Sequence, residues 1–225
     1  MEKGRFAEEG PKEGWEPLCR VAARLAHQLN GVFTVIGGHA ELALLEGADA
    51  APAVRQSLEQ VIEAGRRGRE LVRALQARCR QETPAQSEPE QSASGACPAP
   101  AAAVPSRKMR VLVVDDETGV SRTTARLLET LGCAARVAAE AGEAFRILET
   151  CGESFDLALI DYRMPGIAGE ELARGLRARA PGTALVVVSG ACESLDRERL
   201  RALGVQAFLP KPFRAAELAS LLQSL

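Results

Sequence analysis

The stretch MRVLVVDDE, residues 109–117, decides the fold of the second half of the chain. A short apolar run is followed at once by two aspartates and a glutamate. Further apolar runs lie at DLALI (156–160) and ALVVVS (184–189), with weaker ones at AARVAA (134–139) and VQAFL (205–209). Apolar strands that alternate with helix-like stretches indicate a parallel sheet covered on both faces. We therefore predict a doubly wound α/β domain over residues 108–225, with five strands and five helices.

Acidic side chains follow two of these strands. Asp115 and Asp116 come after the first strand, and Asp161 comes after the third. In an open α/β sheet, ligands bind beyond the carboxyl ends of the strands, and carboxylates that meet there need a cation such as Mg²⁺. Ser189 closes the fourth strand and Lys211 follows the fifth. A metal site, a carboxylate nucleophile, a hydroxyl and a fixed cation together suit phosphoryl transfer.

Four motifs in this half resemble the receiver domain of response regulators: VLVVDDE, DYRMPGIAG, VVVSGA and FLPKPF, in that order. The resemblance implies a flavodoxin-like strand order of 2-1-3-4-5 and a role in two-component phosphorelay signalling. It implies that Asp161 is the phosphoacceptor. It also implies that Asp116, Asp115, Asp161 and the backbone carbonyl of Arg163 bind Mg²⁺.

The same resemblance assigns the remaining residues of the pocket. Ser189 is expected to hydrogen-bond a phosphoryl oxygen, and Lys211 to pair with the phosphoryl charge through a cis Lys211–Pro212 peptide. Phe208 stands at the position of the family's switch aromatic and acts with Ser189. Phe208 has no hydroxyl, so a switch there would depend on packing alone. A receiver that keeps this pocket without receiving phosphate is the alternative.

The first 80 residues have a helical pattern. Apolar or small residues recur in steps of three and four from Leu18 to Ala43 and from Val54 to Leu75. This repeat is typical of a coiled-coil or bundle seam. It predicts a hairpin of two helices, about 17–46 and 51–80, with a break at EGADAAP. Because two helices give a thin core, we expect a homodimer that forms a four-helix bundle.

The two histidines of the chain both lie in this hairpin. Setting the seam as positions a and d places His39 at d, inside the bundle, and His27 at the outermost position f. The stretches LAHQLNGVFTVIGGHAELAL and SLEQVIEAGRRGRELVRAL resemble the dimerisation and histidine-phosphotransfer domain of sensor histidine kinases. That resemblance implies that His27 is an exposed phosphoacceptor. An ordinary surface histidine is the alternative.

The hairpin also departs from the pattern of that family. Gln28 replaces an acid after the histidine, and Gly31 replaces a common Asn or Thr, whereas Asn30 is retained. In place of an ATP-binding domain, residues 81–107 form a Pro-rich stretch that we interpret as a flexible linker. The sequence has no Gly-rich nucleotide loop. We therefore do not expect this chain alone to phosphorylate a histidine from ATP.

Composition narrows the class of partner. The net charge is −2, and neither half is basic enough to follow a nucleic-acid backbone. The six cysteines form no CxxC pair, and no signal peptide or membrane span is recognisable, so we expect a cytoplasmic protein. The basic residues Arg66, Arg67, Arg69 and Arg73 form a solvated helix face or, alternatively, steer an acidic receiver pocket towards His27.

Three hypotheses follow from the sequence. In the first, Asp161 takes phosphate from a histidine kinase or phosphotransfer protein and exchanges it with His27. In the second, the chain is a dimeric adaptor with a receiver switch and an inert His27. In the third, a separate ATPase domain phosphorylates His27 in trans, as in a split histidine kinase.

Overall fold

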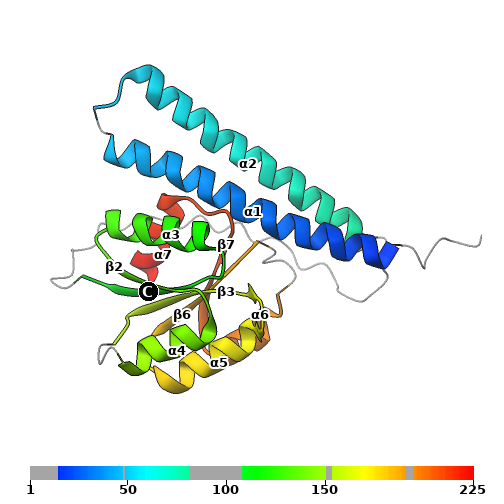
Figure 1. Ribbon diagram of the computed structural model, residues 1–225, viewed down its shortest axis with the longest axis vertical. Helices are drawn as coiled ribbons and strands as arrows, with labels where there is room; N and C mark the ends of the chain where they lie inside the picture. The colour runs from blue at the N-terminus through cyan, green and yellow to red at the C-terminus, as the bar shows by residue number, and fades with distance from the viewer. Residues whose placement is uncertain (1–14, 48, 82–107, 151–153, 191–194) are drawn as a thin grey trace, which may run out of the picture.

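The computed structural model describes residues 15–47, 49–81, 108–150, 154–190 and 195–225. These residues form a long helical hairpin that lies along one side of an α/β domain (Figure 1). The expected linker, apart from Gln81, lies outside the described residues. None of the described helices combines the length and the apolar character needed to cross a membrane.

Five parallel strands form the sheet of the α/β domain. They are β1 (Arg110–Val114), β2 (Ala134–Ala138), β3 (Leu157–Asp161), β6 (Ala184–Ser189) and β7 (Val205–Pro210). The order is β2-β1-β3-β6-β7, so the expected order 2-1-3-4-5 is confirmed. β3 is buried along its whole length and the last four residues of β1 are buried, because helices cover both faces of the sheet.

Helices divide into two layers. α3 (Thr118–Thr130) and α7 (Ala215–Ser224) share one core cluster, whereas α4 (Ala141–Thr150), α5 (Gly169–Arg179) and α6 (Arg197–Ala202) share the other. A short antiparallel pair, β4 (Arg163–Met164) and β5 (Ile167–Ala168), was not predicted. Each strand has two residues, too few for a periodic signal, and Gly166 makes the turn with a φ of 84°.

The hairpin consists of α1 (Trp15–Glu46) and α2 (Pro52–Gln81), close to the predicted bounds. α1 packs against α3, and Leu42 joins the core cluster that includes Leu127 and Leu128 of α3. The opposite side of α1 carries the predicted seam. Leu25, Leu29, Val32 and Ile36 on this side are 42% to 51% exposed in the single chain.

One prediction about the histidines is wrong for the single chain. His27 is not at the outermost position, because its side chain is only 19% exposed and faces the α/β domain. His39 lies on the seam side and is exposed in the single chain, so its enclosure in a four-helix bundle stays a prediction. The reason is that α3 covers the side of α1 that bears His27, which leaves the seam side in solvent.

Candidate functional site

Three carboxylates gather at the carboxyl ends of β1 and β3. One carboxylate oxygen from each of Asp115, Asp116 and Asp161 lies within 4.8 Å of the other two. β1 and β3 are parallel neighbours, so the residues that follow them meet at one edge of the sheet. Asp115 and Asp161 are buried, at 4% and 1% exposure.

A buried lysine joins two of these carboxylates. The Nζ of Lys211 donates to the Oδ2 of Asp115 and to the Oδ2 of Asp161, at 2.6 Å in each case. The backbone N–H of Lys211 donates to the carbonyl of Ser189 at 2.8 Å, and the predicted cis Lys211–Pro212 peptide is confirmed. The Lys211 side chain is 1% exposed. Its hydrogen bonds to the two carboxylates hold the buried ammonium in the pocket.

Burial and charge set the protonation of this cluster. Burial raises the pKa of Asp115 to about 6, and the Asp161 carboxylate adds to this, although Lys211 opposes it. Burial lowers the pKa of Lys211, but Asp161 and Asp115 together raise it above its ordinary value. Lys211 therefore stays a cation. Asp115, with a pKa of about 6, takes up a proton at a pH only slightly below neutral.

The donor set fits a hard divalent cation. Among the described residues, the buried Oδ1 of Asp116 has no hydrogen-bond partner. The backbone N–H of Glu117 donates to the Oδ1 of Asp115, and that of Arg163 donates to the Oδ1 of Asp161, at 3.0 Å each. Oriented carboxylate oxygens with one unsatisfied acceptor suit Mg²⁺. The expected role of the Arg163 carbonyl as a fourth protein ligand stays a prediction.

The two predicted switch residues lie on neighbouring strands. Ser189 ends β6 and is 1% exposed. Phe208 of β7 is half-buried, and the guanidinium of Arg197 from α6 lies 5.3 Å from the centre of its ring. Their functional roles stay predictions.

Comparison with known proteins identifies the α/β domain. The response regulator receiver domain family matches residues 111–223, half of the chain. This chain belongs to the response regulator receiver family.

Individual relatives of the receiver domain come from several signalling proteins. The chain is 36% identical over 110 residues to the sensor kinase CckA of Brucella abortus, covering 49% of this chain and 12% of that protein. It is 28% identical over 117 residues to the response regulator RppA of Synechocystis, covering 52% and 50%. A solved CheY-like receiver domain from Methanospirillum hungatei is 30% identical, with a TM-score of 0.49, and covers 52% of this chain and 93% of that one. The chain thus spans half or less of the length of CckA and of RppA.

The hairpin places His27 beside the receiver pocket. The Nε2 of His27 lies 3.3 Å from the Oε1 of Glu117, the residue after the acidic pair. Three residues further along α1, the Nδ2 of Asn30 donates to the carbonyl of Gly190 at 3.2 Å. Glu117 is half-buried, and that burial raises its pKa. The sequence assigned Glu117 no role, because its partner lies on the other domain.

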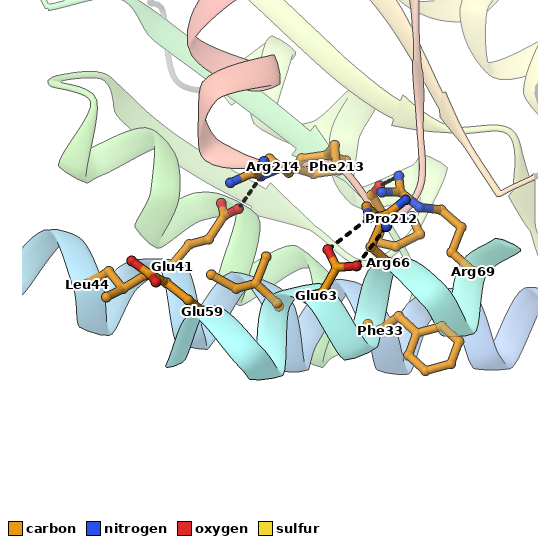
Figure 2. Close-up of a pocket in the computed structure, with 13 residues that line it drawn as sticks. Phe33, Glu41, Leu44, Glu59, Glu63, Arg66, Arg69, Pro212, Phe213 and Arg214 are labelled. Carbon is orange, nitrogen blue, oxygen red and sulfur yellow. Dashed lines mark hydrogen bonds and ion pairs between the residues drawn. The ribbon is translucent and has the colours of Figure 1, made fainter. Parts of the chain in front are cut away.

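A second contact region joins the hairpin to the loop after β7. The guanidinium of Arg69 in α2 donates to the carbonyl of Pro212. Glu41 of α1 accepts from the Nε of Arg214 at 3.2 Å and also from the backbone N–H of Ala215. Figure 2 shows these side chains around a cleft of about 260 Å³ between the hairpin and the receiver. Both contacts lie within four residues of Lys211.

The predicted basic face of α2 is divided. Arg66 pairs with Glu63 and Glu70 on an exposed surface, as expected for a solvated helix face. Arg69 instead leaves that surface for the receiver loop and is half-buried there.

Proposed function

We propose that Asp161 accepts a phosphoryl group from a phosphohistidine of a histidine kinase or phosphotransfer protein. The observation that carries the proposal is the cluster of three carboxylates around the buried Lys211 ammonium. A carboxylate oxygen of Asp161 attacks phosphorus, the P–N bond breaks, and the donor imidazole leaves with the electron pair. Asp115, Asp116 and Asp161 would hold Mg²⁺, which when bound neutralises charge on the phosphoryl oxygens.

Lys211 and Ser189 have complementary parts in this step. Before transfer the ammonium of Lys211 donates a hydrogen bond to Asp161. After transfer it pairs with a phosphoryl oxygen instead. The hydroxyl of Ser189, at the end of the next strand, donates to another phosphoryl oxygen. Positioned charges of this kind provide most of the catalysis in phosphoryl transfer.

We further propose that Asp161 and His27 exchange the phosphoryl group. In that step an imidazole nitrogen of His27 attacks phosphorus and the carboxylate of Asp161 leaves. The position of His27 against Glu117, beside the acidic pair, supports this step. The Asn30–Gly190 hydrogen bond supports it as well, because it holds α1 next to Ser189.

The mapping of phosphate on variants tests both steps. The wild type, Asp161→Ala and His27→Ala proteins are incubated with a small Mg²⁺-dependent phosphodonor such as acetyl phosphate. We expect acyl phosphate in the wild type and in His27→Ala, and no label in Asp161→Ala. Base-stable, acid-labile phosphohistidine is expected in the wild type alone. If Asp161→Ala carries as much label as the wild type, the receiver assignment is contradicted. If the wild type contains no phosphohistidine, His27 is not part of the relay.

The hairpin also supports a proposal of homodimerisation. Its large exposed apolar side chains lie on both helices: Val21, Leu25, Leu29, Val32, Ile36, Leu45, Val54, Val61, Leu71 and Leu75. A second copy of the hairpin would cover them in a four-helix bundle. Leu29→Glu is expected to give monomers in sedimentation measurements, whereas the neighbouring exposed change Gln28→Glu leaves the dimer intact. A monomeric wild type contradicts the proposal.

An adaptor function is the second candidate, and two residues of the hairpin favour it. Gln28 stands where the resembling family has an acid, and Gly31 stands where it often has Asn or Thr. In this case His27 is inert and His27→Ala leaves dimerisation and partner binding unchanged. Phosphohistidine from any donor, including a separate kinase supplied with ATP, excludes the adaptor function.

A further inference from the structure

Two glycines of α1 leave space for receiver side chains. A Cβ built on Gly31 would lie 1.8 Å from the Oε2 of Glu117. A Cβ on Gly38, two helical turns away, would lie 2.3 Å from the Cγ2 of Thr123 in α3. Even alanine therefore does not fit at either position unless the receiver side chain moves.

Two receiver glycines leave space for α1 in the same way. A Cβ on Gly190 would lie 2.6 Å from the Nδ2 of Asn30. A Cβ on Gly119 would lie 3.1 Å from the Cγ2 of Val35. Each domain thus presents gaps that side chains of the other domain fill.

The neighbouring Gly37 shows that the close fit to the receiver is confined to particular glycines of α1. Gly37 is next to Gly38 in α1, and apart from its chain neighbours and the backbone of its own helix no described residue lies within 4 Å of a Cβ built on it. Glycine in a helix interior destabilises the helix relative to alanine. The structure gives Gly31 and Gly38 a compensating role in domain contact, which it does not give to Gly37.

We propose that the hairpin is a docking surface selective for its own receiver, with Gly31, Gly38, Gly119 and Gly190 as the residues that set the selectivity. A receiver with a larger side chain at the place of Gly119 or Gly190 meets Val35 or Asn30 and does not seat. This docking directs the exchange between His27 and Asp161 to the same chain. Its role in exchange therefore rests on the proposed function, whereas the docking itself requires no phosphate.

A matched pair of alanine variants in the full chain tests the docking. The readouts are the nuclear Overhauser contact between the Val35 methyl and the Gly119 α-protons, and the radius of gyration from X-ray scattering. Gly38→Ala is expected to abolish the contact and to increase the radius. Gly37→Ala makes the same change in helix propensity and is expected to alter neither. A docked Gly38→Ala protein overturns the proposal.

A second change in Gly38→Ala should restore docking if the clash is steric. Thr123→Ser removes the Cγ2 methyl but keeps the hydroxyl, which donates to the carbonyl of Gly119 at 2.8 Å. The Cβ of Thr123 is 3.8 Å from the Cβ built on Gly38, an ordinary contact distance. We expect the double variant to recover the Val35–Gly119 contact. Failure to recover it overturns the steric explanation.

The receiver side of the selectivity has its own matched pair. Gly119→Leu mimics a receiver with a larger side chain, and Gly142→Leu changes the corresponding second residue of α4, which faces solvent. We expect only Gly119→Leu to lose docking, with phosphohistidine reduced at least tenfold while acetyl phosphate still labels Asp161. If both leucine variants dock equally well, the selectivity is absent. If Asp161 is not labelled in the wild type but the docking results hold, the proposed function fails and the docking surface stands.

Discussion

Replacement of Lys211 by methionine should destabilise the receiver strongly when no divalent cation is present. The side chains of Lys211, Asp115 and Asp161 are 1%, 6% and 1% exposed, so the two carboxylates have almost no access to water. Methionine keeps most of the apolar volume but leaves both carboxylates without their cation. Breaking a buried ion pair on one side costs about 3–5 kcal/mol. Domains of this size are stable by about 5–15 kcal/mol, so we expect the variant to fold with a reduced free energy of unfolding.

Urea unfolding followed by circular dichroism, in the presence of a chelator, measures this cost. For a slope of about 2 kcal/mol per molar urea, the midpoint should fall by about 2 M at neutral pH. The loss should shrink at pH 5, where protonation of Asp115 removes the repulsion between the two groups, and Mg²⁺ should restore part of it. Lys108→Met is the matched control, because Lys108 is exposed and its replacement should change stability by less than about 0.5 kcal/mol.

The outcome that would refute this reasoning is a Lys211→Met protein within about 1 kcal/mol of the wild type at neutral pH in chelator. That result would mean that the two carboxylates reach solvent without the lysine. A loss that grows at pH 5 would contradict the electrostatic explanation as well.

Three further predictions concern the pocket and the docking surface. Because burial raises the pKa of Asp115 to about 6, the folded protein binds a proton that the unfolded chain releases between pH 4 and pH 6. The contribution of Asp115 to the free energy of unfolding in chelator should therefore fall by up to about 3 kcal/mol as pH rises through this window. In urea unfolding, Asp115→Asn should lack this pH dependence. Mg²⁺ binding, measured by calorimetry, should weaken below pH 6 through proton competition at Asp115 and should be lost in Asp116→Ala. Glu41→Ala should weaken docking by about 1–3 kcal/mol in the scattering assay, because a buried acceptor for Arg214 and Ala215 is removed, whereas Glu46→Ala breaks only an exposed pair and should have little effect.

The sequence was sufficient for the sheet and for the acidic pocket. The apolar runs that became β1, β3 and β6 are covered on both faces, so their strand character was unambiguous. Asp115, Asp161 and Lys211 could be placed together because parallel strands bring their carboxyl ends to one edge. No knowledge of side-chain packing was needed for this step.

The docking of the hairpin could not be predicted in the same way. The heptad pattern identifies the seam side of α1, but the side against α3 includes small and polar residues such as Asn30, Gly31 and Gly38. Gly31 stood out only as a departure from a family pattern. Its physical reason, the carboxylate of Glu117, lies 86 positions further along the chain on another domain. Contacts of this kind leave no periodic signal in a single sequence.

The most direct test of the account is whether Asp161 becomes phosphorylated. Intact-protein mass spectrometry after incubation with acetyl phosphate and Mg²⁺ should detect one added phosphoryl group, and peptide mapping should place it on Asp161. The group should be absent in Asp161→Asn and when a chelator replaces Mg²⁺. An unmodified wild-type protein, or equal modification of Asp161→Asn, would contradict the assignment of this pocket as a phosphoryl acceptor.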